Sequence, residues 1–250
     1  MSSREFDRLG LLALVLVLWT VLSKLSLVSP LFLASPGGVV NAFLDDLQSG
    51  RLGRDLAATA LRIIAGFGLG ALLGVALGAT VASSKRLSTA AAPFVDFARS
   101  VPVTALLPLF LLMFGIGSSA KVAAIAWSSG LVMMINTILG FENVPPARLN
   151  VGRLFGLSRP ALVRQIVLPD AAAQVFVGLR TAVSLAVVVG IVSEMLLSTG
   201  DGIGGRLYDA SVLYDTDRVY LGIILAGTLG YLFNLTVAVA DRRVVHWRGR

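Results

Sequence analysis

Long apolar runs alternate with short charged segments along the whole chain. The runs cover residues 9–28, 56–83, 91–114, 120–139, 171–197 and 219–239. A helix rises about 1.5 Å per residue, so about 20 apolar residues cross the roughly 30 Å hydrocarbon core of a membrane. The pattern therefore predicts an all-α, polytopic membrane protein in which a single domain, residues 1–250, holds six transmembrane helices.

The first run has a rival interpretation as a cleaved signal peptide. Such a peptide begins with a net positive segment and has an apolar core of about 7–15 residues. Here positions 4–8 carry two arginines and two acidic residues, and the apolar run is longer. We therefore expect a transmembrane helix at 9–28. A short helix near 39–47 should follow, with its apolar positions on one face along the outer membrane interface.

Four glycines recur at every fourth position of the second run, namely Gly66, Gly70, Gly74 and Gly78. Between helices in lipid, apolar burial gives no driving force, so small residues that allow close backbone approach mark packing surfaces. The stripe predicts such a surface, either within one subunit or between two copies.

The third run, 91–114, contains Pro102 and Pro108. Proline has no N–H and clashes with the preceding turn, so we expect this helix to be kinked or broken. Broken helices at membrane depth line a cavity or are buried in protein, which makes the segment a candidate solute pathway. The alternative is a simple packing kink. The residues we assign to a candidate substrate pathway are Arg99, Pro102, Pro108, Met113, Arg180 and Glu194.

Composition agrees with a membrane protein and excludes several other classes. Hydrophobic residues make up 56% of the chain and charged residues 14%, compared with about 25% charged residues in a typical soluble domain. The net charge of +7 comes from cations between apolar runs rather than from a basic segment with interleaved aromatic residues, so nucleic acid is not an expected partner. With no cysteine and only His246, we expect no metal site.

Two glycine motifs bear on nucleotide binding. The segment 200–205 satisfies the dinucleotide pattern G-x-G-x-x-G, but it follows an apolar helix rather than a strand, so we interpret it as a turn. No G-x-x-x-x-G-K-[ST] sequence is present. We therefore expect no ATPase activity of the P-loop type and no catalytic residue.

Six spans place both termini and residues 145–168 on the same side of the membrane. That side holds thirteen Lys and Arg residues, Arg180 lies inside a span, and seven lie on the other side. Because cytoplasmic loops are enriched in Lys and Arg, the side with thirteen is cytoplasmic. The seven on the other side are Lys24, Arg51, Arg54, Arg62, Lys121, Arg206 and Arg218.

The segment from Asn150 to Pro169 is basic and lies between two apolar runs. Gly156 suits a sharp turn, and Ser158 with Pro160 suits the start of a second short helix that stops at Pro169. The pattern predicts a helix–turn–helix at the membrane surface. The alternative is a solvated basic loop.

The same segment resembles a motif of a known family. Gly156, nine residues and then Ile166-Val167-Leu168-Pro169 are similar to the EAA loop of permease subunits of ABC importers. Asn150-Val151-Gly152 stand where that family often has Glu-Ala-Ala. Residues 99–117 and Lys121 resemble the nitrate, sulfonate, taurine and bicarbonate subgroup. The resemblance implies a type I ABC importer permease-like fold.

It also implies that residues 145–169 form a coupling loop that docks on a partner ATPase. Leu154 and Phe155 would fill a groove of that ATPase, Arg153 would make a polar contact, and Ile166, Leu168 and Pro169 would anchor the loop. The full set of implied coupling residues is Asn150, Val151, Gly152, Arg153, Leu154, Phe155, Gly156, Leu157, Ser158, Ile166, Leu168 and Pro169.

The function implied by the resemblance is ATP-driven import of a small, anionic solute. The implied partners are ABC ATPase subunits, an extracytoplasmic substrate-binding protein, a second permease copy and the lipid of a bacterial inner membrane. No cofactor is expected on this chain, since ATP and Mg²⁺ would bind to the ATPase. The alternative is a secondary transporter or channel subunit without an ATPase.

Overall fold

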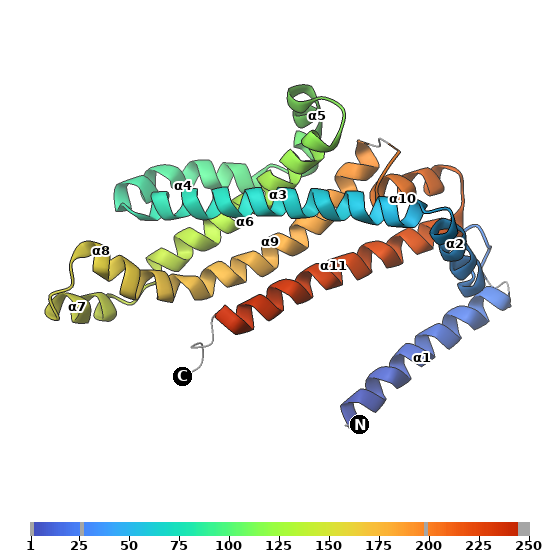
Figure 1. Ribbon diagram of the computed structural model, residues 1–250, viewed down its shortest axis with the longest axis horizontal. Coiled ribbons are helices and arrows are strands. Elements are labelled where there is room, and N and C mark those ends of the chain that lie inside the picture. The colour runs from blue at the N-terminus through green and yellow to red at the C-terminus, as the bar shows by residue number, and fades with distance from the viewer. Residues whose placement is uncertain (1–2, 26–27, 198–199, 245–250) are drawn as a thin grey trace.

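The structure, a computed structural model, describes residues 3–25, 28–197 and 200–244. Each regular element in those ranges is a helix (Figure 1). His246, the basic tail and positions 26–27 of the first expected span lie outside the described residues. The elements are α1 (Ser3–Lys24), α2 (Pro36–Gln48), α3 (Arg51–Ala82), α4 (Lys85–Ser100), α5 (Val103–Phe114), α6 (Ser118–Glu142), α7 (Pro146–Leu154), α8 (Arg159–Leu162), the π-helical turn η1 (Val163–Val167), α9 (Leu168–Leu196), α10 (Ile203–Val212) and α11 (Thr216–Val244).

Four helical stretches in the described residues are long and apolar enough to cross a membrane. They are α3, α6, the continuous stretch Arg159–Leu196 and α11 as far as Arg243. The pair α4 and α5 adds a fifth if it counts as one broken span, and α1 contributes a shorter apolar helix, Ala13–Lys24. The all-helical membrane fold is thus confirmed, while the number six remains a prediction.

The glycine stripe of α3 packs against α6 of the same subunit. A Cβ on Gly66 would lie 2.6 Å from Ile125 Cβ, and a Cβ on Gly78 would lie 2.7 Å from the carbonyl oxygen of Met134. The backbones therefore approach as closely as the expected packing surface requires, and that surface lies within one subunit.

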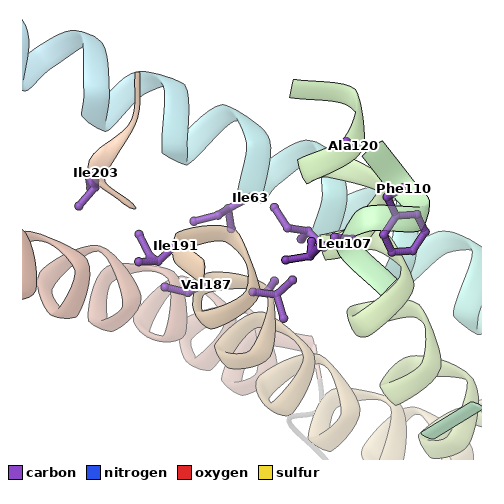
Figure 2. Packing of buried hydrophobic residues seen from close by; sticks show 11 residues of the cluster. Ile63, Leu107, Phe110, Ala120, Val187, Ile191 and Ile203 are labelled. Carbon is purple, nitrogen blue, oxygen red and sulfur yellow. The ribbon is translucent and has the colours of Figure 1, made fainter. Parts of the chain in front are cut away.

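The apolar core lies where α3, α5, α6 and α9 meet (Figure 2). Ile63 and Ile125 are fully buried there. Gly190 allows α9 to approach α3, since a Cβ on Gly190 would lie 3.0 Å from Ile63 Cγ1. This contact fixes the C-terminal part of α9 beside α3.

The third apolar run is broken, as its prolines predict. The axes of α4 and α5 differ by 94°, and Val101 and Pro102 at the break have extended backbone with ψ of 119° and 126°. The first arm begins at Lys85 rather than at residue 91, directly after the end of α3 at Ala82 (Figure 1).

The helix after the turn at Gly156 does not stop at Pro169, contrary to the sequence-based expectation. It runs from Arg159 to Leu196 through α8, η1 and α9. The wider turn η1 precedes the proline, and the Leu168 N–H bonds to the Val163 carbonyl oxygen five residues back. A π-turn relaxes the helical register where proline has no N–H to give, so the chain continues as one helix.

One further element differs from the expectation, and a second agrees with it. The segment after Gly202 forms the helix α10 rather than a turn alone. The short helix α2 exists, but it buries Val39 and Ala42, while Val40, Phe43, Leu44 and Leu47 remain exposed. In Figure 1, α7 and α8 lie at one end of the molecule, and α2 and α10 lie at the opposite end.

Candidate functional site

The first candidate site is the elbow, defined as residues 145–169. Helix α7 ends at Leu154, and Gly156 adopts φ of 74°, a left-handed conformation that glycine adopts without steric cost. The Leu157 N–H then donates to the Gly152 carbonyl oxygen at 3.0 Å. Ser158 precedes α8 in extended conformation, as an N-cap does, but its side chain makes no cap hydrogen bond.

The two halves of the elbow are packed together tightly. A Cβ on Gly152 would lie 2.5 Å from Leu162 Cδ2 and 2.6 Å from Ile166 Cδ1. Gly152 is therefore the contact point between α7 and the helix that follows. Arg148 forms an ion pair with Asp170, which ties α7 to the first turn of α9.

The tip of the elbow exposes apolar side chains. Leu154 is 87% exposed and Phe155 is 82% exposed, and Val151 on the same helix is half exposed. Arg153 lies beside them and donates to Asn150 Oδ1 at 3.2 Å. Ile166 and Pro169 are half-buried and Leu168 is half exposed where the elbow joins α9. Exposed apolar side chains gathered at a projecting turn are typical of a protein–protein contact.

Four of the candidate pathway residues lie around the break between α4 and α5. Arg99 is fourteen positions after Lys85, which is about 21 Å along α4. It therefore lies far from the end of the molecule at which α4 begins. Its Nε donates to Asp96 Oδ1 at 3.1 Å, and both side chains are more than 60% exposed. Pro102, Pro108 and Met113 are also exposed. This stretch presents an irregular, mostly apolar surface whose charged side chains are Arg99 and Asp96.

The other two pathway candidates lie elsewhere and are paired. Arg180 Nη2 contacts Asp241 Oδ2 at 2.5 Å and so links α9 to α11. Glu194 is 1% exposed, and its carboxylate is bound to partners from α3 and α10. Glu194 therefore leaves no surface for a solute, and the structure does not bring the six candidates together.

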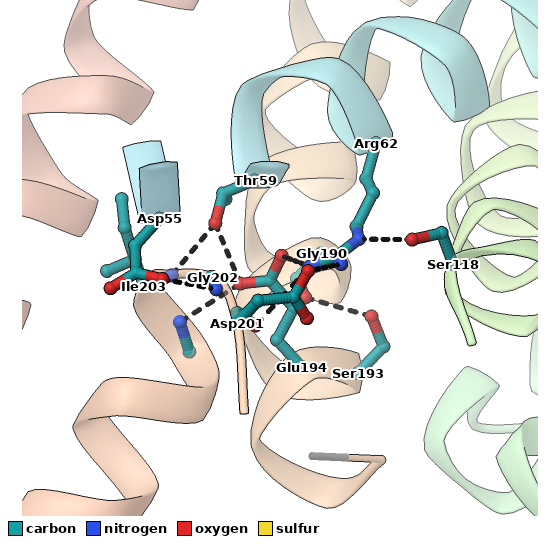
Figure 3. Close-up of polar contacts among 11 residues, drawn as sticks. Asp55, Thr59, Arg62, Ser118, Gly190, Ser193, Glu194, Asp201, Gly202 and Ile203 are labelled. Atoms are coloured by element: carbon teal, nitrogen blue, oxygen red, sulfur yellow. Dashed lines mark hydrogen bonds and ion pairs between the residues drawn. The ribbon is translucent and has the colours of Figure 1, made fainter. Parts of the chain in front are cut away.

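Glu194 belongs to an ion-pair cluster, defined here as Asp55, Thr59, Arg62, Glu194 and Asp201, in which every member except the half-exposed Asp201 is buried (Figure 3). Arg62 Nη1 donates to Glu194 Oε1 at 2.7 Å, and Arg62 Nη2 donates to Asp201 Oδ2 at 2.6 Å. Thr59 Oγ1 donates to Glu194 Oε2 at 2.8 Å. Arg62 is thereby neutralised by two carboxylates although its side chain is only 6% exposed.

The cluster also holds the start of α10. The Gly202 N–H donates to Asp55 Oδ1 at 3.0 Å, and the Gly204 N–H donates to Glu194 Oε2 at 3.0 Å. The Ile203 N–H donates to Thr59 Oγ1 at 2.9 Å. Arg206 on α10 contacts Asp55 Oδ2 at 2.7 Å. The turn predicted at 200–205 is thus present as far as Gly202, with φ of 78° at Gly200 and 93° at Gly202, and α10 begins at Ile203.

Arg62 and Lys121 are among the seven cations counted on the side opposite the elbow. Both lie inside long helices, and both are buried. A signal for Arg62 was present: Asp55, Thr59 and Arg62 recur at i, i+4 and i+7 of an apolar helix, which places them on one face. That polar stripe continues directly into the glycine stripe on the same face.

Comparisons with known proteins agree with this arrangement. The chain is 31% identical over 236 residues to a putative aliphatic sulfonates transport permease protein, SsuC, of Bacillus subtilis (strain 168), covering 94% of this chain and 85% of that protein. It is 33% identical to the nitrate import permease protein NrtB of Leptolyngbya laminosa, covering 76% of this chain and 68% of that protein.

The fold is similar to that of the MetNI methionine ABC transporter solved in an inward-facing conformation. The TM-score is 0.69 at 16% sequence identity, over 80% of this chain and 98% of the matched chain. Residues 66–246, which include the elbow and most of the bundle, match the model of one transporter family. The chain belongs to the family of inner membrane components of binding-protein-dependent transport systems.

Proposed function

We propose that this chain forms the membrane pathway of an ATP-driven importer of small anions, with the elbow as the docking point of the ATPase. Membership of the family implies that the subunit works with an ATPase and a substrate-binding protein. The proposal adds the site of docking, the orientation, a second copy of this chain and the class of solute. ATP and Mg²⁺ bind to the ATPase in this scheme.

The observation that carries the proposal is the elbow itself. Leu154 and Phe155 are almost fully exposed at the tip of a turn that lies at one end of the bundle. The helix that leaves the turn continues without interruption to Leu196, close to the opposite end. A partner that binds this tip and changes its own conformation would move the whole helix Arg159–Leu196, which runs through the membrane domain.

The distribution of cations supports a cytoplasmic elbow. Of the seven cations assigned to the opposite side, Arg62 and Lys121 are buried in helices and are not loop charges. Of the thirteen cations assigned to the elbow's side, Arg99 lies about 21 Å along α4 from Lys85 and is also left out of the count. Twelve cations then remain on the elbow's side and five on the opposite side. The bias toward the elbow's side persists, and it favours both termini and the elbow in the cytoplasm.

The break between α4 and α5 supports a pathway shared by two copies. Irregular backbone at membrane depth is tolerated only where protein covers it or where it lines a water-filled cavity. In one subunit Ser100, Pro102 and Thr104 are exposed. A second copy that faces this surface would bury part of it and enclose the rest as a solute pathway.

The relatives support a small anion as solute, because their names assign sulfonates and nitrate to them. Arg99 supplies a cation on the exposed surface beside the break. A guanidinium matches sulfonate and nitrate oxygens through paired N–H donors. The solute would replace Asp96 as the ion-pair partner of Arg99.

Co-purification of the tagged subunit from its native host tests the proposed docking point. Wild type should retain a P-loop ATPase, while the double substitution Leu154→Ser with Phe155→Ser should reduce the retained ATPase by about tenfold or more, because a few well-packed residues carry most of the binding energy of an interface. Leu213→Ser is the matched control, since Leu213 is 77% exposed at the opposite end. Full retention of the ATPase by the double variant would overturn the proposal.

A further inference from the structure

We infer that Glu194 is a positioning residue: it attaches the turn Gly200–Gly202 and helix α10 to the end of α9, so that motion of the elbow reaches the opposite face of the membrane domain. The attachment itself follows from contacts within this chain. The transmission of elbow motion rests on the proposed function.

One carboxylate joins three elements. Glu194 lies near the end of α9 and accepts hydrogen bonds from Arg62 and Thr59 of α3 and from the Gly204 N–H of α10. Its side chain is 1% exposed, so all these bonds are shielded from water. Hydrogen bonds to a buried charge are worth more than exposed ones, because water cannot replace them.

Helix α10 depends on these contacts for its N-terminal cap. Its N-cap is Gly202, and no side chain of the adjacent segment caps it. Its first N–H groups are bound instead by Asp55 from α3 and Glu194 from α9. Two carboxylates at the positive end of the helix dipole satisfy donors that would otherwise be unpaired in a buried location.

The turn lies directly on Glu194. A Cβ on Gly202 would be 2.6 Å from the Glu194 carboxyl carbon, and a Cβ on Gly204 would be 2.7 Å from Glu194 Cβ. Both glycines are buried. Displacement of the Glu194 side chain therefore displaces the turn, and the turn carries α10 with it.

The elbow and Glu194 are on the same helix. From Arg159 to Glu194 the chain runs through α8, η1 and α9 as one stretch, about 50 Å long at the usual helical rise. The elbow is at its first residues and the cluster is near its last. If the helical stretch Arg159–Glu194 tilts at the elbow, the bonds of Glu194 would displace α10 as well.

The charges around Glu194 are balanced, which explains how the cluster is tolerated in an apolar bundle. Arg62 and Lys121 face Glu194 and Asp201, and the adjacent pair Asp55 and Arg206 is neutral. Replacing Glu194 by Gln keeps its size but leaves the group with a net positive charge. A buried, uncompensated charge is strongly unfavourable, so the turn should open in that variant.

Thiol labelling of α10 measures this opening directly. The chain has no cysteine, so Ala210→Cys introduces its sole thiol, at a position that is 5% exposed. The assembled transporter is reconstituted in proteoliposomes without nucleotide and treated with a membrane-impermeant maleimide. Glu194→Gln should raise the labelling rate about tenfold or more, as expected when a protected segment opens locally.

Matched controls separate opening from general damage. Asp209→Asn removes an exposed carboxylate from the same helix and should leave the labelling rate at the wild-type value. Tyr208→Cys, an exposed reporter, should label equally in all backgrounds. If Glu194→Gln does not assemble, Thr59→Val removes the Thr59 bonds to Glu194 and to the Ile203 N–H and keeps every charge, and a rise of about threefold or more is expected. Wild-type labelling in an assembled Glu194→Gln or Thr59→Val complex overturns the positioning role.

A second arm tests transmission. Trapping the ATPase with ATP and vanadate should change Ala210→Cys labelling in the otherwise wild-type complex and leave it unchanged in Glu194→Gln. If Glu194→Gln responds to nucleotide as wild type does, the transmission is overturned. If nucleotide has no effect even with Glu194 intact, but Glu194→Gln still opens α10, the positioning role stands and the proposed ATP coupling fails.

Discussion

Arg62 on α3 and Glu194 on α9 form a buried ion pair with an Nη1–Oε1 distance of 2.7 Å, across 132 positions of sequence. Their side chains are 6% and 1% exposed. Neither charge has access to water, so each depends on the other and on the hydroxyl and carboxylate groups around them. The pair is the main polar connection between these two helices in the described residues.

A double-mutant cycle should reveal this dependence. Glu194→Gln alone should destabilise the purified subunit by about 3–5 kcal/mol, because it leaves Arg62 buried without its main partner. The double variant Arg62→Met with Glu194→Gln should cost less than the two single changes together. Denaturant-induced unfolding in detergent measures the free energies, and strictly additive costs would contradict the pairing.

The glycine stripe makes a sharper steric prediction. Gly74→Ala should destabilise the subunit by about 1–3 kcal/mol, since an added methyl would overlap the Gly130 carbonyl oxygen and Met133 Cβ. Gly68→Ala, on the same helix with nothing within 4 Å, is the matched control. It should be neutral or stabilising by up to about 1 kcal/mol, because alanine favours helix. Equal effects of the two substitutions on thermal unfolding would disprove the close contact with α6.

At Gly156 the constraint is conformational rather than steric. Its φ is 74° and nothing lies within 4 Å of an added Cβ. Gly156→Val should cost about 1–2 kcal/mol locally and distort the elbow, because a branched side chain disfavours the left-handed region. Gly156→Asn should retain most ATP-dependent uptake, as asparagine tolerates that region. Better uptake with valine than with asparagine would contradict the turn as described.

Arg99 is expected to act on the solute rather than on the ATPase. Arg99→Gln should lower anion uptake by about 10- to 100-fold, the value of a lost charge-assisted hydrogen bond, with little change in the ATPase rate. Asp96→Asn removes the partner of Arg99 and should weaken uptake far less. Uptake and radiolabelled solute retention are measured side by side, and an Arg99→Gln transporter with normal uptake would remove Arg99 from the pathway.

Local signals in the sequence were sufficient for much of the fold. The break at Pro102, the turn at Gly156 and the packing stripe from Gly66 to Gly78 each arise from the backbone properties of one residue type. The structure agrees in all three places. The sequence left open whether the stripe packs within or between subunits, because both use the same close approach.

Other features carry no local signal in the sequence. Helix α10 begins at Ile203 followed by two glycines, a poor helix start, and is held by carboxylates from α3 and α9. The continuation through Pro169 depends on η1, a turn type that propensities do not anticipate. The partner of Arg180 is Asp241, on a different helix. Tertiary contacts therefore hold α10 and pair Arg180, whereas η1 is a local change of helix type.

Solute uptake by proteoliposomes tests most directly whether the elbow transmits the conformational change of the ATPase to the membrane domain. The assembled transporter, with its binding protein outside and ATP trapped inside, should accumulate a labelled sulfonate or nitrate. The double variant Leu154→Ser with Phe155→Ser should not accumulate it, although it inserts normally. Accumulation that persists without ATP, or at the wild-type rate in the double variant, would contradict the account.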